Sequence, residues 1–245
     1  MRFRLALAAC LAAAGAQPSA AADTATLTIL YQEMAPFIEK APTGEVTGPV
    51  AERVAAVAAQ AGVRLDWVGS IPRSRIIAEM EAGRPACLPN ARKTPDREKL
   101  FKFSQPLFEA PDYRVVLKKE RAQRYETLND LLNDPELILG ALLGVSLGPE
   151  IDAIIKDRGT NVLVTRGSMV DLVRLLHAGR IDYIILDELD YRIAAGQEGV
   201  PRAATVSRTF PDLPTTEPGR IMCARTVPDE VMSRLDRAIA GTRPS

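Results

Sequence analysis

Short runs of apolar and β-branched residues alternate along the chain with longer amphipathic stretches. In the first half, the strand candidates are Thr26–Tyr31, Arg64–Val68 and Ala86–Pro89. Pro49–Ala61 has apolar residues at helical spacing, proline at its start and Gly62 after its end. Ile71–Ala82 has the same pattern, with Ser70 as a candidate N-cap and Gly83 as the stop. This β-α-β-α-β order predicts a mostly parallel sheet covered by helices.

The alternation resumes after Tyr113–Lys118, an apolar run with a basic end. The later strand candidates are Ile138–Leu143, Val162–Thr165, Ile181–Leu186 and Arg220–Arg225. The later helix candidates are Gly148–Lys156, Met169–Ala178 with Ser168 as N-cap, Leu189–Ala195 and Pro228–Ala240. Glu198–Pro218, which holds several prolines, is the loosest stretch.

Two α/β halves followed by one late strand and one late helix predict two lobes. We expect the chain to leave the first lobe at about Lys118 and to re-enter it near Arg220. Lobe 1 then comprises residues 23–118 and 220–245, and lobe 2 comprises residues 119–219. Because ligands of open α/β sheets bind at the carboxyl ends of the strands, we expect a ligand cleft between the lobes.

Residues 1–22 have the pattern of a secretory signal. Arg2 and Arg4 precede the apolar run Leu5–Gly15, and the small residues Ala20–Ala22 suit cleavage after Ala22. An alternative is lipoprotein processing at Cys10. The run is shorter than the roughly 20 apolar residues that span a bilayer, so we expect a soluble, periplasmic mature chain.

The charge balance and the cysteine and histidine counts limit the partners and cofactors that we expect. The 31 basic and 31 acidic residues of the whole chain become 29 and 31 once Arg2 and Arg4 are removed, a net charge of −2 that favours neither nucleic acid nor an anionic membrane. Cys87 and Cys223 remain after the signal, and we predict that they form a disulfide, the alternative being two buried thiols. With no CxxC motif and one histidine, His177, the sequence implies no metal or other cofactor.

One segment carries a resemblance to a known family. Arg92-Lys93-Thr94-Pro95-Asp96-Arg97-Glu98, followed by Phe103-Ser104-Gln105-Pro106, resembles the "R-T-P-E-R-E…F-S-x-P" signature of family 3 solute-binding proteins. These are the receptors of polar amino-acid uptake systems of the ABC type. Weaker matches follow in the family's order: Ala35-Pro36-Phe37 with Thr47-Gly48, Gly144-Val145-Ser146, and Gly179-Arg180-Ile181-Asp182 with Asp187-Glu188.

The resemblance implies a type II periplasmic binding-protein fold, with two α/β lobes joined by a two-strand hinge. It also implies a monomer that closes around a small solute and then docks on a membrane permease complex. Arg97 would hold the ligand carboxylate, since its planar fork of donors suits two oxygens, and the alternative is a surface arginine in a charged run. Asp187, at a strand end, would accept from a ligand ammonium, cap the next helix, or do both.

Other candidate site residues follow from the same comparison. Ser146 precedes a predicted helix whose free backbone N–H groups suit an anion, although an ordinary glycine-rich turn explains it equally well. Family members often place aromatic rings where Met34 and Pro72 stand here, and Val145 replaces a common hydroxyl, so the ligand is a carboxylate-bearing solute that need not be a standard amino acid. The full ligand-binding prediction is Arg97, Asp187, Ser146, Met34, Asn90, Arg92 and Pro72.

No catalytic motif of the GxSxG, HExxH or Walker type occurs in the sequence, so we predict a binding protein and not an enzyme. Two alternatives remain open. Periplasmic dehydratases of cyclic amino-acid precursors resemble this receptor fold, and a sensory or orphan module of the same fold would bind ligand without serving a transporter.

Overall fold

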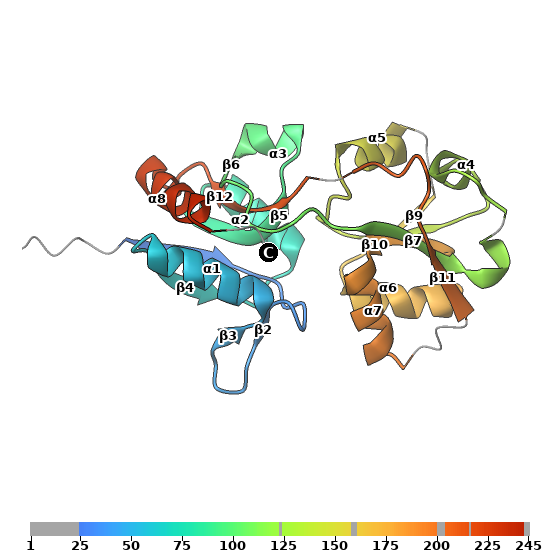
Figure 1. The fold of residues 1–245 in the computed structure, drawn as a ribbon, viewed down its shortest axis with the longest axis horizontal. Helices are drawn as coiled ribbons and strands as arrows, with labels where there is room; N and C mark the ends of the chain where they lie inside the picture. Colours follow the sequence, from blue (N-terminus) through green and yellow to red (C-terminus); the bar gives the residue numbers. More distant parts are fainter. Residues whose placement is uncertain (1–24, 123, 158–160, 200–203, 216, 243–245) are drawn as a thin grey trace, which may run out of the picture.

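The computed structural model describes residues 25–122, 124–157, 161–199, 204–215 and 217–242. The predicted signal at residues 1–22, and with it Cys10, lies outside these ranges. The described chain forms two sheets with helices around each, which lie side by side as two lobes (Figure 1).

The first sheet has the strand order β4-β1-β5-β12-β6. Its strands are β1 (Thr26–Leu30), β4 (Arg64–Val68), β5 (Ala86–Arg92), β6 (Phe101–Phe103) and β12 (Gly219–Ala224). β1 pairs in parallel with β4 and β5, while β12 runs antiparallel between β5 and β6. The helices of this lobe are α1 (Pro49–Gln60), α2 (Arg73–Glu81), α3 (Pro95–Leu100) and α8 (Asp229–Ala240), and a small hairpin joins β2 (Glu39–Lys40) to β3 (Val46–Thr47).

The second sheet has the order β11-β7-β10-β8-β9. Its strands are β7 (Tyr113–Lys118), β8 (Leu139–Leu142), β9 (Val162–Thr165), β10 (Tyr183–Asp187) and β11 (Thr205–Arg208). β8 pairs in parallel with β9 and β10, and β7 runs antiparallel between β10 and β11. The short helical turn η1 (Lys119–Arg121) and the helices α4 (Leu128–Leu132), α5 (Pro149–Asp157), α6 (Met169–His177) and α7 (Glu188–Gln197) belong to this lobe.

Each sheet has its own apolar core. Buried residues of β1, α1 and α8, among them Ile29, Val57 and Leu235, pack together in the first lobe. In the second lobe, residues of β7, α4 and β10 such as Leu117, Leu131 and Tyr183 form a separate cluster. Separate cores let the two lobes keep their internal packing while they move relative to each other.

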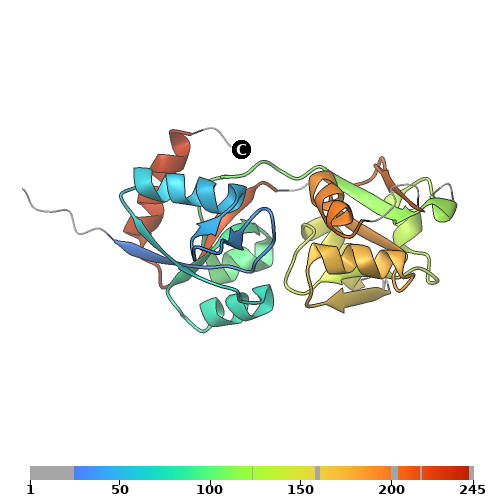
Figure 2. The same cartoon turned by 90° about the horizontal axis from the view of Figure 1, so that it is seen from below.

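The chain crosses between the lobes twice, at residues 104–112 and again between β11 and β12 (Figure 2). The first crossing corrects the predicted boundary at Lys118. β7 pairs with β10 along its whole length, from Tyr183 opposite Leu117 to Asp187 opposite Tyr113, so Tyr113–Lys118 belongs to lobe 2. The apolar run alone could not show which sheet it would join.

Local predictions also needed correction. Ser70 does not cap α2, because Pro72 occupies the N-cap position and makes no side-chain capping bond. The Arg97 segment, for which no helix was predicted, forms the helix α3. The stretch expected to be loosest, Glu198–Pro218, contains the strand β11, whose pairing with β7 supplies the order that its own sequence does not.

The predicted disulfide is confirmed. Cys87 in β5 and Cys223 in β12 lie directly opposite each other in the antiparallel pair, with Cα atoms 4.0 Å apart and sulfur atoms bonded. Both residues are fully buried. The bond therefore links the returning strand to the strand that leads into α3. Within the described residues, no helix is both long and apolar enough to cross a bilayer.

Candidate functional site

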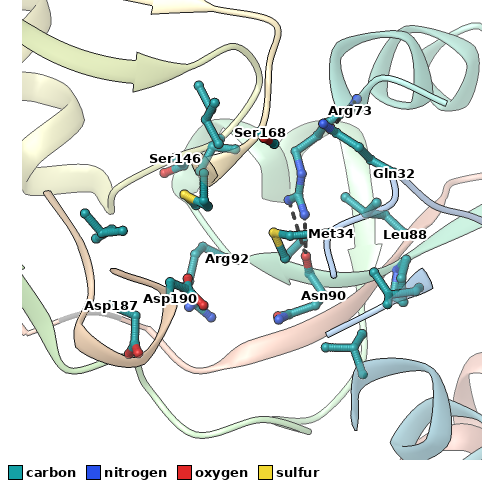
Figure 3. A pocket seen from close by; sticks show the side chains of 18 of the residues that line it. Gln32, Met34, Arg73, Leu88, Asn90, Arg92, Ser146, Ser168, Asp187 and Asp190 are labelled. Atoms are coloured by element: carbon teal, nitrogen blue, oxygen red, sulfur yellow. Dashed lines mark hydrogen bonds between the residues drawn. The ribbon is translucent and has the colours of Figure 1, made fainter. Parts of the chain in front are cut away.

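A small cavity lies between the lobes, at the carboxyl ends of β5 and β10 (Figure 3). Its volume of about 120 Å³ is below the roughly 300–1,000 Å³ of sites for drug-sized ligands, so the cavity suits a small solute. Six of the predicted site residues line it: Met34, Asn90, Arg92, Arg97, Ser146 and Asp187. Their contacts with a ligand stay a prediction.

Pro72 does not line this cavity. It is exposed at the start of α2, and the side chain that enters the cavity from this helix is that of the next residue, Arg73 (Figure 3). The family resemblance thus pointed to the start of α2, where the neighbouring residue lines the cavity.

Arg97 is held by the first turn of α3. Pro95 begins this helix, and the Thr94 hydroxyl caps it by accepting from the Arg97 backbone N–H at 3.3 Å. The guanidinium donates through Nη1 to the Arg92 carbonyl at 3.2 Å and through Nη2 to the Gly144 carbonyl at 2.8 Å. Since Gly144 belongs to the other lobe, Arg97 joins the two lobes at the edge of the cavity.

Arg73 is the first residue of α2, and its backbone N–H donates to Gln32 Oε1 at 3.0 Å. Its Nη1 and Nη2 both donate to the Asn90 carbonyl, each at 3.3 Å, which aims the guanidinium across the cavity (Figure 3). Burial lowers the pKa of Arg73 to about 10, and repulsion from Arg97 and Arg92 adds to the effect. Arg73 remains cationic at neutral pH in a place that disfavours its charge.

Arg92 and Asn90 lie at the carboxyl end of β5, and both line the cavity. Arg92 lowers the pKa of the Tyr113 hydroxyl, which burial raises, and Arg92 Nε is buried without a partner among the described residues. Asn90 Oδ1 is likewise buried and without a partner there. Buried polar groups are nearly always paired, so unpaired ones beside a cavity are candidates for binding.

Asp187 caps α7, as the sequence allowed. Its Oδ1 accepts from the Leu189 backbone N–H at 2.8 Å, and its Oδ2 accepts from the Asp112 backbone N–H at 2.9 Å. Asp112 belongs to the first crossing segment, so this carboxylate also ties the crossing to lobe 2. Each oxygen has a lone pair left for a ligand ammonium.

Asp190 is a cavity residue that the sequence reasoning missed. It lies in the first turn of α7, three residues after Asp187, and lines the cavity beside Arg92 (Figure 3). Burial, with a smaller effect of the Asp187 charge, raises the pKa of Asp190 to about 6, and Arg92 opposes this shift. The spacing of three residues after a strand-end aspartate, which keeps both on one side of a helix, was the available signal.

Ser146 is buried in the turn before α5. Its hydroxyl donates to the Asp152 carboxylate and accepts from the Gly148 backbone N–H at 3.1 Å, and Asp152 also accepts from the Leu147 N–H at 2.9 Å. The turn therefore satisfies much of its own hydrogen bonding. Among the described residues, no group of three or more His, Cys, Asp or Glu side chains is arranged to hold a metal ion.

Comparison with protein families identifies the chain. The family model of bacterial extracellular solute-binding proteins, family 3, matches residues 27–240, which is nearly all of the described chain. The protein belongs to this family. The match spans both lobes and both crossings, so the predicted resemblance is confirmed over the whole fold. A comparison with curated proteins found no match.

Solved structures confirm the predicted type II periplasmic binding-protein fold. An ancestral arginine-binding protein bound to arginine is 23% identical, with a TM-score of 0.70 over 88% of this chain and 91% of that one. An amino acid ABC transporter substrate-binding protein from Streptococcus pneumoniae, bound to L-arginine, is 21% identical, with a TM-score of 0.67 over 88% of each chain. An ancestral amino acid-binding protein, a precursor of cyclohexadienyl dehydratase, is 20% identical, with a TM-score of 0.68 over 88% of each chain. At these identities the likeness shows the fold.

Proposed function

We propose that this family member is a periplasmic receptor that captures a small, carboxylate-bearing, amino-acid-like solute by closing its lobes and delivers it to an ABC-type permease. Residues 1–22, with their signal pattern, support export. The structural neighbours include an ABC transporter substrate-binding protein, which supports the permease as partner.

Arg97 carries the proposal. Its guanidinium borders the cavity, uses backbone carbonyls as its hydrogen-bond acceptors and contacts both lobes. A guanidinium has five N–H donors, so donors remain for a carboxylate. A ligand carboxylate bound there would be held beside the contact between the lobes, which couples binding to closure.

The direct test is a thermal-shift screen of amino acids, small carboxylates and amines, followed by calorimetry on the hits. A ligand that binds only the folded protein raises its melting temperature. Arg97→Ala should abolish detectable binding, since the loss of a buried charged partner costs on the order of 2–5 kcal/mol, and should leave the fold stable. Arg237→Ala, which removes an exposed arginine from the same lobe, is the control. Unchanged affinity in Arg97→Ala would rule out the carboxylate role.

One observation favours a second candidate, catalysis on the same fold. Asp190 lies at the cavity with a pKa of about 6, close to the range in which a carboxyl group serves as a general acid. Mass spectrometry of a bound ligand after prolonged incubation with the protein separates the two functions. A receptor returns the ligand unchanged, and a ligand that loses mass with turnover would show an enzyme.

A further inference from the structure

Three arginines surround the cavity without a carboxylate partner. Arg73, Arg92 and Arg97 all line it, and across the described ranges none of them has an acidic side chain within ion-pair distance. The hydrogen-bond acceptors of Arg73 and Arg97 are backbone carbonyls, and Arg92 Nε is buried without a partner in those ranges. Charged side chains that are partly buried normally pair with an opposite charge, so this cluster lacks its anions.

The three arginine charges repel one another while no anion is bound between them. Arg92 and Arg97 each lower the pKa of Arg73, which shows that the three charges act on one another. The two bonds of Arg73 to the Asn90 carbonyl, both 3.3 Å long, are at the weak end of the hydrogen-bond range. A carboxylate in the cavity would replace them by shorter, charge-assisted bonds to the same two nitrogen atoms.

The acidic side chains that line the cavity determine which other charges the ligand should carry. Asp187 and Asp190 line the cavity, with Asp190 beside Arg92 (Figure 3), and the charge of Asp152 acts on Arg97. Glu33 also borders the cavity, but it is exposed and its charge is screened by water. No acidic side chain is among the charges that act on Arg73, so its positive charge is the one left for the ligand to neutralise.

Resting on the proposed function, we propose that the ligand is an acidic amino acid, with two carboxylates and one ammonium. Arg97 binds one carboxylate, Arg73 and Arg92 form a second anion subsite for the other, and the ammonium faces Asp190 and Asp187. Such a ligand brings a carboxylate to Arg73, whose charge no acidic side chain offsets. A neutral amino acid leaves Arg73 unpaired, and arginine adds a fourth guanidinium to three that already repel one another.

The small cavity limits the ligand to a short side chain, for which L-aspartate and L-glutamate are the natural probes. This differs from the solved neighbours named above, two of which hold arginine. The difference is physically reasonable because the fold is shared at 23% identity or less, while the ligand is selected by individual side chains such as Arg73.

The experiment is calorimetry with matched pairs, L-glutamate against L-glutamine and L-aspartate against L-asparagine. The amides have the same size and the same α-carboxylate, but no second charge. In at least one pair the acid should bind at least tenfold more tightly. Arg73→Gln should lower the affinity for that acid by at least tenfold and change the affinity for its amide less than threefold. Arg92→Gln repeats the test on the other subsite residue, and thermal unfolding shows that each variant is folded.

The outcomes separate the two proposals. Acid and amide bound equally well, or L-arginine bound more tightly than either acid, would overturn the acidic ligand and leave the receptor function intact. If no amino acid or small carboxylate binds, the proposed function itself fails. Glutarate, which has two carboxylates and no amine, should bind more weakly than L-glutamate, and equal binding would overturn the role given to Asp190 and Asp187.

Discussion

Asp187 and Asp190 are three residues apart on α7, yet their surroundings differ. Both oxygens of Asp187 accept backbone N–H groups, which holds the carboxylate in place. Asp190 has its pKa raised by burial. We therefore expect Asp187 mainly to hold the start of α7 in place, and Asp190 to change its charge with pH and with ligand binding.

A proton and a ligand ammonium should compete for Asp190. Its pKa of about 6 means that it is largely ionised at pH 7.5, while at pH 5 only about one molecule in eleven carries the charge. Between these pH values the affinity for an amine-bearing ligand such as L-glutamate should fall about tenfold. Calorimetry at both pH values in wild-type protein measures the effect, with Arg92 and Asp187 as the nearby charges that modulate it.

Asp190→Asn is the variant that tests the assignment. It should bind weakly at both pH values, because the charge that attracts the ammonium is gone. His177, whose pKa is lowered by burial and by the charge of Lys118, does not line the cavity, so His177→Gln should keep the pH dependence. A tenfold change that persists in Asp190→Asn would assign the titration to another group.

The site residues differ in how far sequence could reveal them. Arg97 stands in a specific run of residues, and Asp187 follows an apolar strand at once, so both were predictable. Arg73 and Asp190 are single charged residues in helices whose surfaces carry many charges, and only the packing of α2 and α7 against the sheets turns these two inward. Pro72 was predicted to bind ligand but does not line the cavity, whereas the next residue, Arg73, does.

Among the secondary-structure elements, those with a clear apolar period were predicted closely, as with β4, β7 and β9. α3 was missed because it has no buried face: none of its residues is buried, and it is a helix because Thr94 caps it and Pro95 begins it. A cap followed by proline was the readable signal. β11 was missed because its order comes from pairing with β7, which is distant in sequence.

The disulfide between β5 and β12 stabilises lobe 1 as a unit. Cys87 and Cys223 are 136 residues apart in sequence, so the bond closes a loop that contains the whole of lobe 2. Chain-entropy arguments give roughly 4–5 kcal/mol for so long a loop, an upper value that real bonds often miss. Both crossings lie within that loop, and the bond does not restrain the lobes against each other.

Reduction should therefore lower stability without removing binding. In urea, the free energy of unfolding should fall by roughly 2–4 kcal/mol when the bond is reduced, while ligand affinity in native buffer changes less than threefold. The Cys87→Ala, Cys223→Ala double variant should behave like the reduced protein, apart from the loss of two buried sulfur atoms. Equal unfolding midpoints with and without reductant, or two free thiols found by mass spectrometry in protein purified without reductant, would contradict this.

At the scale of the whole molecule, the two lobes meet at the Arg97 contact. The Gly144 carbonyl accepts from Arg97 Nη2, and the Gly144 backbone also lies against α2. A Cβ at this position would be 3.3 Å from the Ser74 N atom and 3.5 Å from Arg73 Cγ, both on the other lobe. Gly144 has a φ of +79°, where a side chain is disfavoured even without neighbours. The glycine thus permits both the turn after β8 and the close approach of the lobes.

Gly144→Ala should weaken closure more than it weakens the fold. The added methyl group crowds Ser74 only when the lobes are together, so the closed state loses about 1 kcal/mol relative to the open one. Since the observed affinity falls with the population of the binding-competent state, ligand binding should weaken about three- to tenfold. X-ray scattering should show a smaller decrease in radius of gyration at a fixed, subsaturating ligand concentration than in wild-type protein.

The control variant must replace a glycine that also has a positive φ but does not contact the other lobe. Gly199 has a φ of +62°, and a Cβ there would meet nothing within 4 Å, so Gly199→Ala costs backbone strain alone. Both variants should lose similar thermal stability, while Gly144→Ala alone should lose affinity. If Gly199→Ala weakens binding as much, strain in lobe 2 explains the loss. If neither variant changes affinity, the contact at Gly144 does not contribute to the ligand-bound state, and closure must depend on the ligand's own contacts with the two lobes.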